Sequence, residues 1–390
     1  MAQSVIVYAG RSAIGKLGGA LSQKPAPRIG AALVKDALNA MKIDPKIVDE
    51  IIMGQVLTAG VGQAPARQAS IYGGLPNSVC ATTINRVCGS GLKAVMLADQ
   101  AIRSSESRFL FAGGQETMSL APHLLMNSRQ GYKFGAIEAK DSMQWDGLWD
   151  PYNNVAMGNC GDVCAKEYKF SREQQDDYAL ESYARARKGA ESGHFKKEIV
   201  PVEVTQGKST IMFQEDEGPF AVDLAKIRGL KPAFDKEGSV TAGNASSIND
   251  GAALLAVVSE DFARELGLKV LARVVAQASV AQDPVWFTTA PVACIRKVLS
   301  KADLKTSDIK HFEINEAFAV VPMAATKDLG LDSALVNPLG GAVALGHPIG
   351  ASGARILVTM IHGLQRAGGG YGLATLCIGG GEASAVVLKV

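Results

Sequence analysis

The feature that most constrains the fold of this chain is a weak internal repeat that relates its two ends. Three short blocks near the N-terminus recur in the same order near the C-terminus, at offsets of 261, 262 and 266 residues. The pairs are V-D-E-I-I-M-G at 48–54 with I-K-H-F-E-I-N at 309–315, C-G-S-G at 88–91 with G-A-S-G at 350–353, and G-G-Q-E at 113–116 with G-G-G-E at 379–382. Glycine-rich blocks match by chance when taken singly, but their shared order and spacing predict two copies of one structural unit.

Hydrophobic periodicity indicates that helices alternate with strands in this unit. Residues 28–42 have the pattern of an amphipathic helix, and residues 51–57 have that of a buried strand. A second helix is expected from Ser90 to about Arg103, followed by a strand at 108–112. This alternation predicts the α/β class.

The length of the chain implies more than one domain. A chain of 390 residues exceeds what one hydrophobic core ordinarily holds, so two or three domains are expected. We predict an N-terminal half from residues 1–118 plus 250–267, and a C-terminal half from residues 268–390. The segment 119–249 lies outside the repeat and contains a polar helix at about 171–193, which begins with the capping-box sequence S-R-E-Q. So long a segment predicts a loop domain that covers the duplicated body.

Charge and hydropathy exclude several classes of function. Lys plus Arg number 40 and Asp plus Glu number 38, a net charge of +2 without the basic excess typical of nucleic-acid binding. No stretch reaches the roughly 18 apolar residues that a membrane span needs. The N-terminus has the pattern of a first strand rather than of a signal peptide. We therefore expect a cytoplasmic protein with no nucleic-acid partner and no membrane span.

The six cysteines predict free thiols rather than a metal site. Cys160 and Cys164 lie four residues apart on an expected helix, but no nearby His or Cys pair completes a zinc site, so no metal is expected. In a reducing compartment, most such cysteines are small buried residues, and one or two are left for chemistry.

Cys88 is the first candidate for that chemistry. It lies in N-R-V-C-G-S-G-L-K-A-V, residues 85–95, where an apolar helix begins just after the cysteine. The unpaired N–H groups and positive partial charge of a helix N-terminus favour a thiolate, so we expect the pKa of Cys88 to be lowered. The alternative is a buried Cys in a glycine-rich helix contact, and this segment alone leaves both interpretations open.

His347 occupies the matching place in the second copy. It lies in N-P-L-G-G-A-V-A-L-G-H-P-I-G-A-S-G, residues 337–353, three residues before the position that repeats Cys88. A turn of Gly and Pro before a helix start is an unusual place for a core His and suits a ligand-binding or catalytic group. The alternative is a structural His in that turn.

Two further polar positions follow strand-like segments of the second copy. Cys377 ends the apolar run L-A-T-L-C, which runs into three glycines, and open α/β sheets place ligands at such strand ends. Successive glycines also let backbone N–H groups converge on an oxyanion. Asn315, in E-I-N-E-A-F, is able to orient a water or donate a hydrogen bond. The alternatives are a buried strand Cys and a helix-capping Asn.

Taken together, these segments resemble the thiolase family over essentially the whole chain. The matching motifs are N-R-V-C-G-S-G-L-K-A, K-P-A-F-D-K-E-G, T-A-G-N-A-S-S-I-N-D-G-A-A, N-E-A-F, G-H-P-I-G-A-S-G and C-I-G-G-G-E. Their number and order make a chance match very improbable. The resemblance implies a duplicated, five-layered αβαβα body with an inserted loop domain, and a homotetramer or homodimer.

The resemblance also implies acyl transfer between coenzyme A thioesters, which are substrates, and no permanently bound cofactor. Cys88 would be the nucleophile that takes the acyl group. His347 would activate Cys88 and, with a water held on Asn315, form one oxyanion hole. Cys377 would be the acid and base at the α-carbon of the second acetyl-CoA. The backbone N–H groups of Cys88 and Gly379 would form the second oxyanion hole.

The same resemblance suggests which residues line the channel for the pantetheine arm of coenzyme A. Ser246 is expected near the pantetheine, and Met157 matches a position of the acetyltransferase type. The other expected lining residues are Leu148, Phe234, Ala242, Ala317 and Phe318. Phe234 and Phe318 suit a hydrophobic core equally well, because channels and cores are both apolar.

Among thiolases, the covering segment most resembles the acetyl-CoA C-acetyltransferase type. That type joins two acetyl-CoA into acetoacetyl-CoA and CoA, or catalyses the reverse thiolysis. Two positions depart from it, since Ala156 stands where His is common and Phe287 where many bacterial members carry Met. Phe also occurs there in relatives that accept 2-methyl-branched substrates. A degradative 3-ketoacyl-CoA thiolase with a broader or branched substrate range, and a non-catalytic acyl-CoA- or lipid-binding relative, are the alternatives.

Overall fold

A computed structural model describes residues 2–390, and within that span eleven strands form one mixed sheet. The strands of its main path are, in spatial order, β15 (Ile309–Ile314), β16 (Tyr371–Ile378), β17 (Glu382–Lys389), β14 (Ala272–Ala281), β1 (Ser4–Ser12), β13 (Asn249–Ser259), β5 (Phe109–Thr117), β3 (Glu50–Gly54) and β4 (Cys80–Ile84). Two short strands extend it, because β10 (Ile199–Val200) pairs with β1 and β2 (Gly15–Lys16) pairs with β13.

The pairing of these strands repeats across the sheet. In the N-terminal half, β1 is antiparallel to β13, β13 is antiparallel to β5, and β5 is parallel to β3. In the C-terminal half, β14, β17, β16 and β15 follow the same order with the same directions. An antiparallel contact of β1 with β14 joins the two halves, with Val5 opposite Arg273. The predicted duplication is therefore confirmed in the topology.

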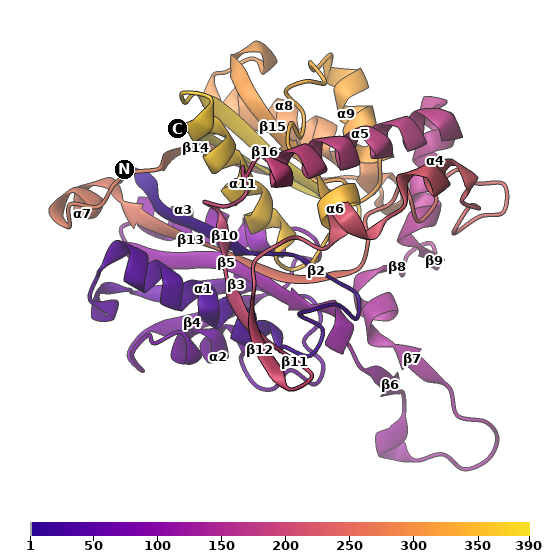
Figure 1. The fold of residues 1–390 in the computed structure, drawn as a ribbon, viewed down its shortest axis with the longest axis horizontal. Coiled ribbons are helices and arrows are strands. Elements are labelled where there is room, and N and C mark those ends of the chain that lie inside the picture. Colours follow the sequence, from indigo (N-terminus) through magenta and orange to yellow (C-terminus); the bar gives the residue numbers. More distant parts are fainter. Residues whose placement is uncertain (1) are drawn as a thin grey trace.

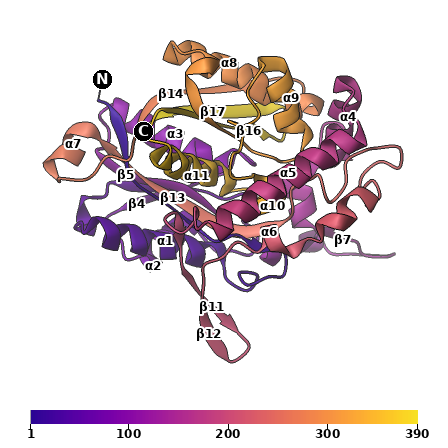
Figure 2. The same ribbon diagram turned by 45° about the horizontal axis from the view of Figure 1, so that its top comes forward.

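The helices account for the remaining layers. They are α1 (Ala26–Met41), α2 (Pro65–Tyr72), α3 (Ser90–Arg103), α4 (Met157–Tyr168), α5 (Arg172–Glu191), α6 (Gly218–Ala221), α7 (Glu260–Glu265), α8 (Ala290–Ala302), α9 (Val320–Leu329), α10 (Ala342–Leu345) and α11 (Ser352–Arg366). Figure 1 and Figure 2 show α1 and α2 on one outer side, α8 and α9 on the other, and α3 with α11 between the two half-sheets. This is the five-layered αβαβα body expected from the sequence.

Each interface between layers has its own hydrophobic core. Leu33 and Phe111 belong to the core beneath α1, and Ile295 and Phe312 belong to the core beneath α8. The central core surrounds α3 and α11 and includes Leu92, Ile356 and Leu376. Because it is covered on both faces, α11 is buried throughout residues 352–361, including its polar residues Arg355 and Thr359.

The N-terminal ends of the two central helices touch through glycines. A Cβ atom on Gly91 of α3 would lie 2.9 Å from the backbone nitrogen of Ala354 and 3.0 Å from the oxygen of Gly350. A Cβ atom on Gly353 of α11 would lie 2.4 Å from the backbone nitrogen of Leu92. Gly91 and Gly353 are equivalent positions of the repeat, so the contact is symmetric. These glycines allow the segments before the two helices to meet.

The inserted segment begins and ends beside the body and contains three small sheets of its own. Their strands are β6 (His123–Leu125) with β7 (Ala139–Asp141), β8 (Trp149–Asp150) with β9 (Val155–Ala156), and β11 (Val202–Gln206) with β12 (Ser209–Phe213). The predicted polar helix is α5, and its capping box between Ser171 and Gln174 is present. Arg11 of β1 anchors the insert through buried ion pairs with Glu198 and Asp216, each with an N–O distance of 2.7 Å. The exact domain boundaries stay predictions.

Among residues 2–390, no helix combines the length and the apolar character needed to cross a bilayer.

Substituting Gly353 with Ala tests the close helix contact. The new methyl group would overlap the backbone of Leu92, which cannot move without shifting α3. We expect the free energy of unfolding to fall by roughly 2 kcal/mol, even though Ala favours helices over Gly by about 1 kcal/mol. Denaturant titration measures the change. Gly229→Ala is the matched control, because no atom lies within 4 Å of the added methyl group, and a loss as small as in this control would contradict the account.

Candidate active site

Cys88 lies in a tight turn directly before α3. Val87 adopts a φ of 46°, in the left-handed region that β-branched residues rarely occupy. Hydrogen bonds hold this conformation: the backbone N–H of Arg86 donates to Ser90 Oγ over 2.8 Å, and Ser90 Oγ donates to the carbonyl of Val87 over 2.7 Å. The Arg86 guanidinium also forms a 2.8 Å ion pair with Glu382 of β17. The turn is therefore fixed to both halves of the body.

The sulfur of Cys88 is enclosed by backbone donors and a second sulfur. The backbone N–H groups of Gly379 and of Cys88 itself lie near this sulfur and lower the pKa of the Cys88 thiol. Cys377, at the end of β16, is fully buried, and its pKa is raised well above the ordinary value by burial and by the neighbouring Cys88. The structure thus brings Cys88, Cys377 and Gly379 together.

The expected lowering of the Cys88 pKa is wrong for the unliganded site. Burial raises the pKa of Cys88 to about 11, against the lowering effect of the Gly379 and Cys88 N–H groups. The buried carboxylate of Glu116 raises it further. The sequence argument counted the helix N-terminus but not the removal of water, which disfavours a charged sulfur. The resting Cys88 is a neutral thiol.

His347 lies between α10 and α11, and hydrogen bonds hold both its backbone and its ring. Its backbone N–H donates to Asn249 Oδ1 over 3.0 Å, and its Nδ1 lies 2.6 Å from Ser352 Oγ. Ser352 Oγ donates its hydrogen to the carbonyl of Pro348 over 2.9 Å. Nδ1 must then carry the hydrogen in its contact with Ser352, which leaves Nε2 with a lone pair.

The remaining ring nitrogen of His347 is free to act on another group. Nε2 is buried and has no hydrogen-bond partner among residues 2–390. Burial, together with the positive charge of Arg355, lowers the pKa of His347 to about 3. The ring is therefore neutral at pH 7, with an acceptor turned into the protein rather than into solvent.

Asn315 follows β15 and has an unusual side-chain environment. Its backbone N–H donates to the carbonyl of Thr375 over 3.0 Å, which fixes its position beside β16. Its side chain is buried, and neither the amide nitrogen nor the amide oxygen has a partner among residues 2–390. Buried amides without partners are costly, so this arrangement points to a bound water or substrate atom.

Glu116 links the Cys88 and His347 segments. Its Oε2 accepts hydrogen bonds of 2.9 Å from the backbone N–H groups of Val56 and Gly350. Burial raises its pKa to about 8, and these N–H donors oppose that rise. Once ionised, Glu116 raises the pKa of Cys88, while Gly350 lies three residues after His347. Both segments therefore meet at the crossing of α3 and α11.

The residues expected near the pantetheine fall into two groups that differ in depth, and the first group lies near Cys88 or at the surface. Met157 approaches Gly379, Leu148 packs in the cluster that includes Cys88, and Ala242 is exposed. Phe234 is 40% exposed and meets Phe318 edge-to-face at 6.2 Å between ring centroids.

The second group lies deeper. Phe287 is buried behind Phe318 at 6.3 Å, Ala317 is also buried, and both the N–H and the Oγ of Ser246 donate to the carbonyl of Ala317 over 3.0 Å. The Ser246 hydroxyl hydrogen is thus already engaged.

Sequence reasoning missed two serines that hold the site in place. Ser90 fixes the Cys88 turn, and Ser352 fixes the His347 ring. They occupy the same position in the repeated blocks C-G-S-G and G-A-S-G. The repeat itself was the signal that could have found them. Among residues 2–390, no group of three or more His, Cys, Asp or Glu is placed to hold a metal ion.

Comparison with known proteins identifies the family. The model of the thiolase N-terminal domain matches residues 4–261, and that of the thiolase C-terminal domain matches residues 268–390. The chain belongs to the thiolase family. This thiolase is 51% identical over 384 residues to an acetyl-CoA acetyltransferase of Yarrowia lipolytica, covering 98% of this chain and 96% of the relative. It is 49% identical over 391 residues to the acetyl-CoA acetyltransferase of Escherichia coli K12, and the match covers 100% of this chain and 99% of the relative.

A solved structure shows the same architecture. This thiolase superposes on the crystal structure of the Bacillus anthracis acetyl-CoA acetyltransferase with a TM-score of 0.97. The two sequences are 40% identical, and the match covers 100% of this chain and 99% of the other. The thiolase fold expected from the sequence is confirmed.

Alkylation of Cys88 by iodoacetamide tests the neutral resting thiol. Because its pKa is raised to about 11, the thiolate fraction should keep growing with pH. We expect the alkylation rate, followed by the mass of the Cys88 peptide, to climb throughout the range from about pH 7 to about pH 10. The exposed Cys80 in the same digests is the reference thiol. A plateau at or below about pH 8 would support the lowered pKa instead.

Proposed function

We propose that this thiolase is an acetyl-CoA C-acetyltransferase, which condenses two acetyl-CoA to acetoacetyl-CoA and CoA and catalyses the reverse thiolysis. The observation that carries the proposal is the neighbourhood of two thiols, Cys88 and Cys377, with the Gly379 N–H close enough to Cys88 to lower the pKa of its thiol. The neutral His347 has a free Nε2, and Ile349, two residues further along, packs in the same cluster as Cys88. The similarity to acetyl-CoA acetyltransferases over the whole chain supports the same activity.

The first half-reaction acylates Cys88. As Sγ of Cys88 attacks the thioester carbonyl, its proton passes to Nε2 of His347, which is unprotonated at rest. The N–H groups of Cys88 and Gly379 stabilise the carbonyl oxygen as charge develops on it. When the carbon–sulfur bond of the substrate breaks, the thiol of Cys377 gives its proton to the departing CoA. Cys377 is then a thiolate and His347 an imidazolium.

The second half-reaction uses the charges left by the first. The Cys377 thiolate takes the α-proton of a second acetyl-CoA, and its raised pKa makes it a strong base for this step. A water on the unpartnered amide of Asn315, together with Nε2–H of His347, stabilises the enolate oxygen. The enolate carbon attacks acetyl-Cys88, the Cys88 sulfur leaves, and His347 returns its proton to it. Both thiols and the neutral ring are restored.

Replacing each thiol separately tests this division of labour. Cys88→Ala should lose both acetylation by acetyl-CoA and thiolysis of acetoacetyl-CoA, because no sulfur remains to carry the acyl group. Cys377→Ser should acquire the acetyl group on Cys88 more slowly, because no thiol protonates the departing CoA. It should lose overall turnover by about 1,000-fold or more, because a hydroxyl is a poor base at neutral pH.

Peptide mass analysis and steady-state rates measure the two effects, and Cys80→Ser on the exposed edge strand is the control. Full turnover in Cys88→Ala would contradict the mechanism.

A degradative thiolase is the second candidate, because Ala156 and Phe287 depart from the acetyltransferase pattern. Phe287 is buried beside Phe318, so its effect on substrate shape would be transmitted through that ring. Initial rates with acetoacetyl-CoA, 2-methylacetoacetyl-CoA and longer 3-ketoacyl-CoA decide between the two. We expect acetoacetyl-CoA to give the highest kcat/KM, and a higher value for a longer or branched substrate would favour the degradative reaction.

We also propose that the enzyme acts in the cytoplasm, where its six free cysteines would stay reduced.

We further propose that the enzyme is a homo-oligomer, a tetramer or a dimer. The hairpin of β6 and β7 projects from the body (Figure 1). Its exposed apolar side chains are Leu125, Met126, Tyr132, Phe134 and Ile137. An apolar surface of this kind on a projecting arm is typical of a protein contact.

Charged substitutions on this hairpin test the oligomer. Phe134 is fully exposed, so Phe134→Asp with Ile137→Asp should leave the fold of a protomer unchanged. We expect analytical ultracentrifugation to show a smaller assembly for this variant than for the wild type. An identical sedimentation coefficient for both proteins would show that the hairpin is not part of the interface. A monomeric wild type would contradict the proposed oligomer.

The location of a fluorescent fusion in cells tests the proposal that the enzyme acts in the cytoplasm.

A further inference from the structure

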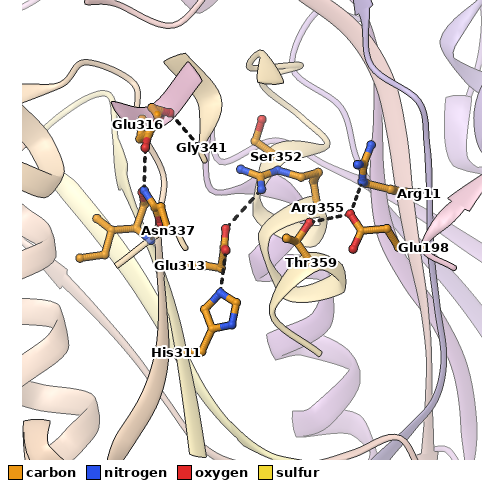
Figure 3. Close-up of polar contacts among 12 residues, drawn as sticks. Arg11, Glu198, His311, Glu313, Glu316, Asn337, Gly341, Ser352, Arg355 and Thr359 are labelled. Carbon is orange, nitrogen blue, oxygen red and sulfur yellow. Dashed lines mark hydrogen bonds and ion pairs between the residues drawn. The ribbon is translucent and has the colours of Figure 1, made fainter. Parts of the chain in front are cut away.

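Glu316 directly follows Asn315, and its carboxylate is fully buried at the junction of three segments. It accepts hydrogen bonds from four donors. They are Tyr178 Oη at 2.9 Å, Asn337 Nδ2 at 2.9 Å, Ser182 Oγ at 2.8 Å and the backbone N–H of Val343 at 3.0 Å. Figure 3 shows Glu316 beside Asn337 and Gly341. No step of the proposed reaction uses this carboxylate.

The donors connect Glu316 to the parts of the chain that present the site. Tyr178 and Ser182 belong to α5 of the inserted segment, and Val343 belongs to α10, which ends just before His347. Ser182 Oγ also accepts the backbone N–H of Gly341 over 3.0 Å. One carboxylate therefore fixes the covering helix, the approach to His347 and, through the chain itself, Asn315.

Gly341 confirms how closely the chain approaches this carboxylate. A Cβ atom there would lie 2.3 Å from Cδ of Glu316, so only glycine fits. Further along the chain, the N–H of His347 donates a hydrogen bond to Asn249, and the N–H of Gly350 donates one to Glu116. Side chains from other elements thus hold the segment 341–350 at several points, and Glu316 binds it at Val343.

The polarity of this network requires a hydrogen-bond acceptor at both carboxyl oxygens of Glu316. Asn337 donates to the carbonyl of Ile314 and accepts its N–H, both over 2.8 Å, so its amide cannot turn around. Its second Nδ2 hydrogen must point at Oε1 of Glu316, while the Val343 N–H points at Oε2. Each carboxylate oxygen therefore faces one donor that cannot become an acceptor. An amide at position 316 would place its NH2 group against one of them in either orientation.

We propose that Glu316 is a positioning residue, which holds Asn315 and His347 in reactive register by joining α5, the Asn337 turn and α10. The inference rests on the proposed function, because it assigns Glu316 a part in that reaction. In this role, Glu316 lets the covering helix α5 help to position the catalytic residues, in addition to covering the substrate. A displacement of about 1 Å at a reacting group is enough to cost on the order of 100-fold in rate.

Glu316→Gln is the decisive variant, since it keeps the shape and reverses one hydrogen bond. We expect kcat for thiolysis of acetoacetyl-CoA to fall by about 100-fold, with KM within about threefold of the wild type, because the substrate contacts stay while the reacting groups shift. Glu181→Gln is the matched control on α5, since its carboxylate is largely exposed and bonded to Arg185. This control should change kcat by less than about twofold.

If Glu316 served stability alone, Glu316→Gln would lower the amount of folded enzyme but not the kcat of each folded molecule. Rates are therefore expressed per folded enzyme, after melting curves establish the folded fraction. A folded Glu316→Gln enzyme with kcat within about threefold of the wild type would overturn the proposal. If this variant does not fold, Ser182→Ala replaces it, because the loss of that hydroxyl leaves the Gly341 N–H unpaired. We then expect about a tenfold loss of kcat, and unchanged kcat would overturn the proposal.

A crystal structure of Glu316→Gln separates this inference from the proposed function. We expect Asn315 or His347 to be displaced by about 1 Å relative to the wild type, whichever reaction the enzyme catalyses. Unmoved side chains would overturn the positioning role. A wild-type enzyme with no thiolysis activity would overturn the proposed function, while the crystal comparison would still decide the role of Glu316.

Discussion

The close contact between the N-terminal ends of α3 and α11 brings the reactive segments of the two halves together. Gly91 and Gly353 let the two backbones approach to distances that a methyl group would prevent. Each helix is preceded by a segment that carries chemistry, with Cys88 before one and His347 before the other. The duplication of the fold thus creates a site that neither copy could form alone. The same positions of the repeat, Ser90 and Ser352, support the two groups.

The electrostatics of the site favour a neutral resting state. Burial raises the pKa of Cys88 and Cys377 and lowers that of His347, so neither sulfur nor ring is charged at pH 7. Such a site has little tendency to ionise in the absence of a substrate. Charge develops only when a thioester supplies an oxygen for the N–H of Gly379 to stabilise, which is how an enzyme favours the transition state over the ground state.

Much of this could be predicted from the sequence, because the relevant signals are local or repeated. The helix from Ser90 to Arg103 has the predicted limits, and the ordered repeats gave the duplicated body. The pKa of Cys88 could not be predicted, since burial depends on elements that are distant along the chain. The anchoring of His347 by Asn249 and Glu116, and the network around Glu316, also escaped prediction. A buried carboxylate and an exposed one look alike in a sequence.

In the proposed reaction, the Cys88 sulfur takes the acyl group, and the N–H groups of Cys88 and Gly379 bind the acyl oxygen. A crystal structure of the enzyme soaked briefly with acetyl-CoA tests this most directly. We expect an acetyl group on Sγ of Cys88, with its carbonyl oxygen about 3 Å from the backbone nitrogens of Cys88 and Gly379. An acetyl group on Cys377, or a carbonyl oxygen turned away from Gly379, would contradict the proposed reaction.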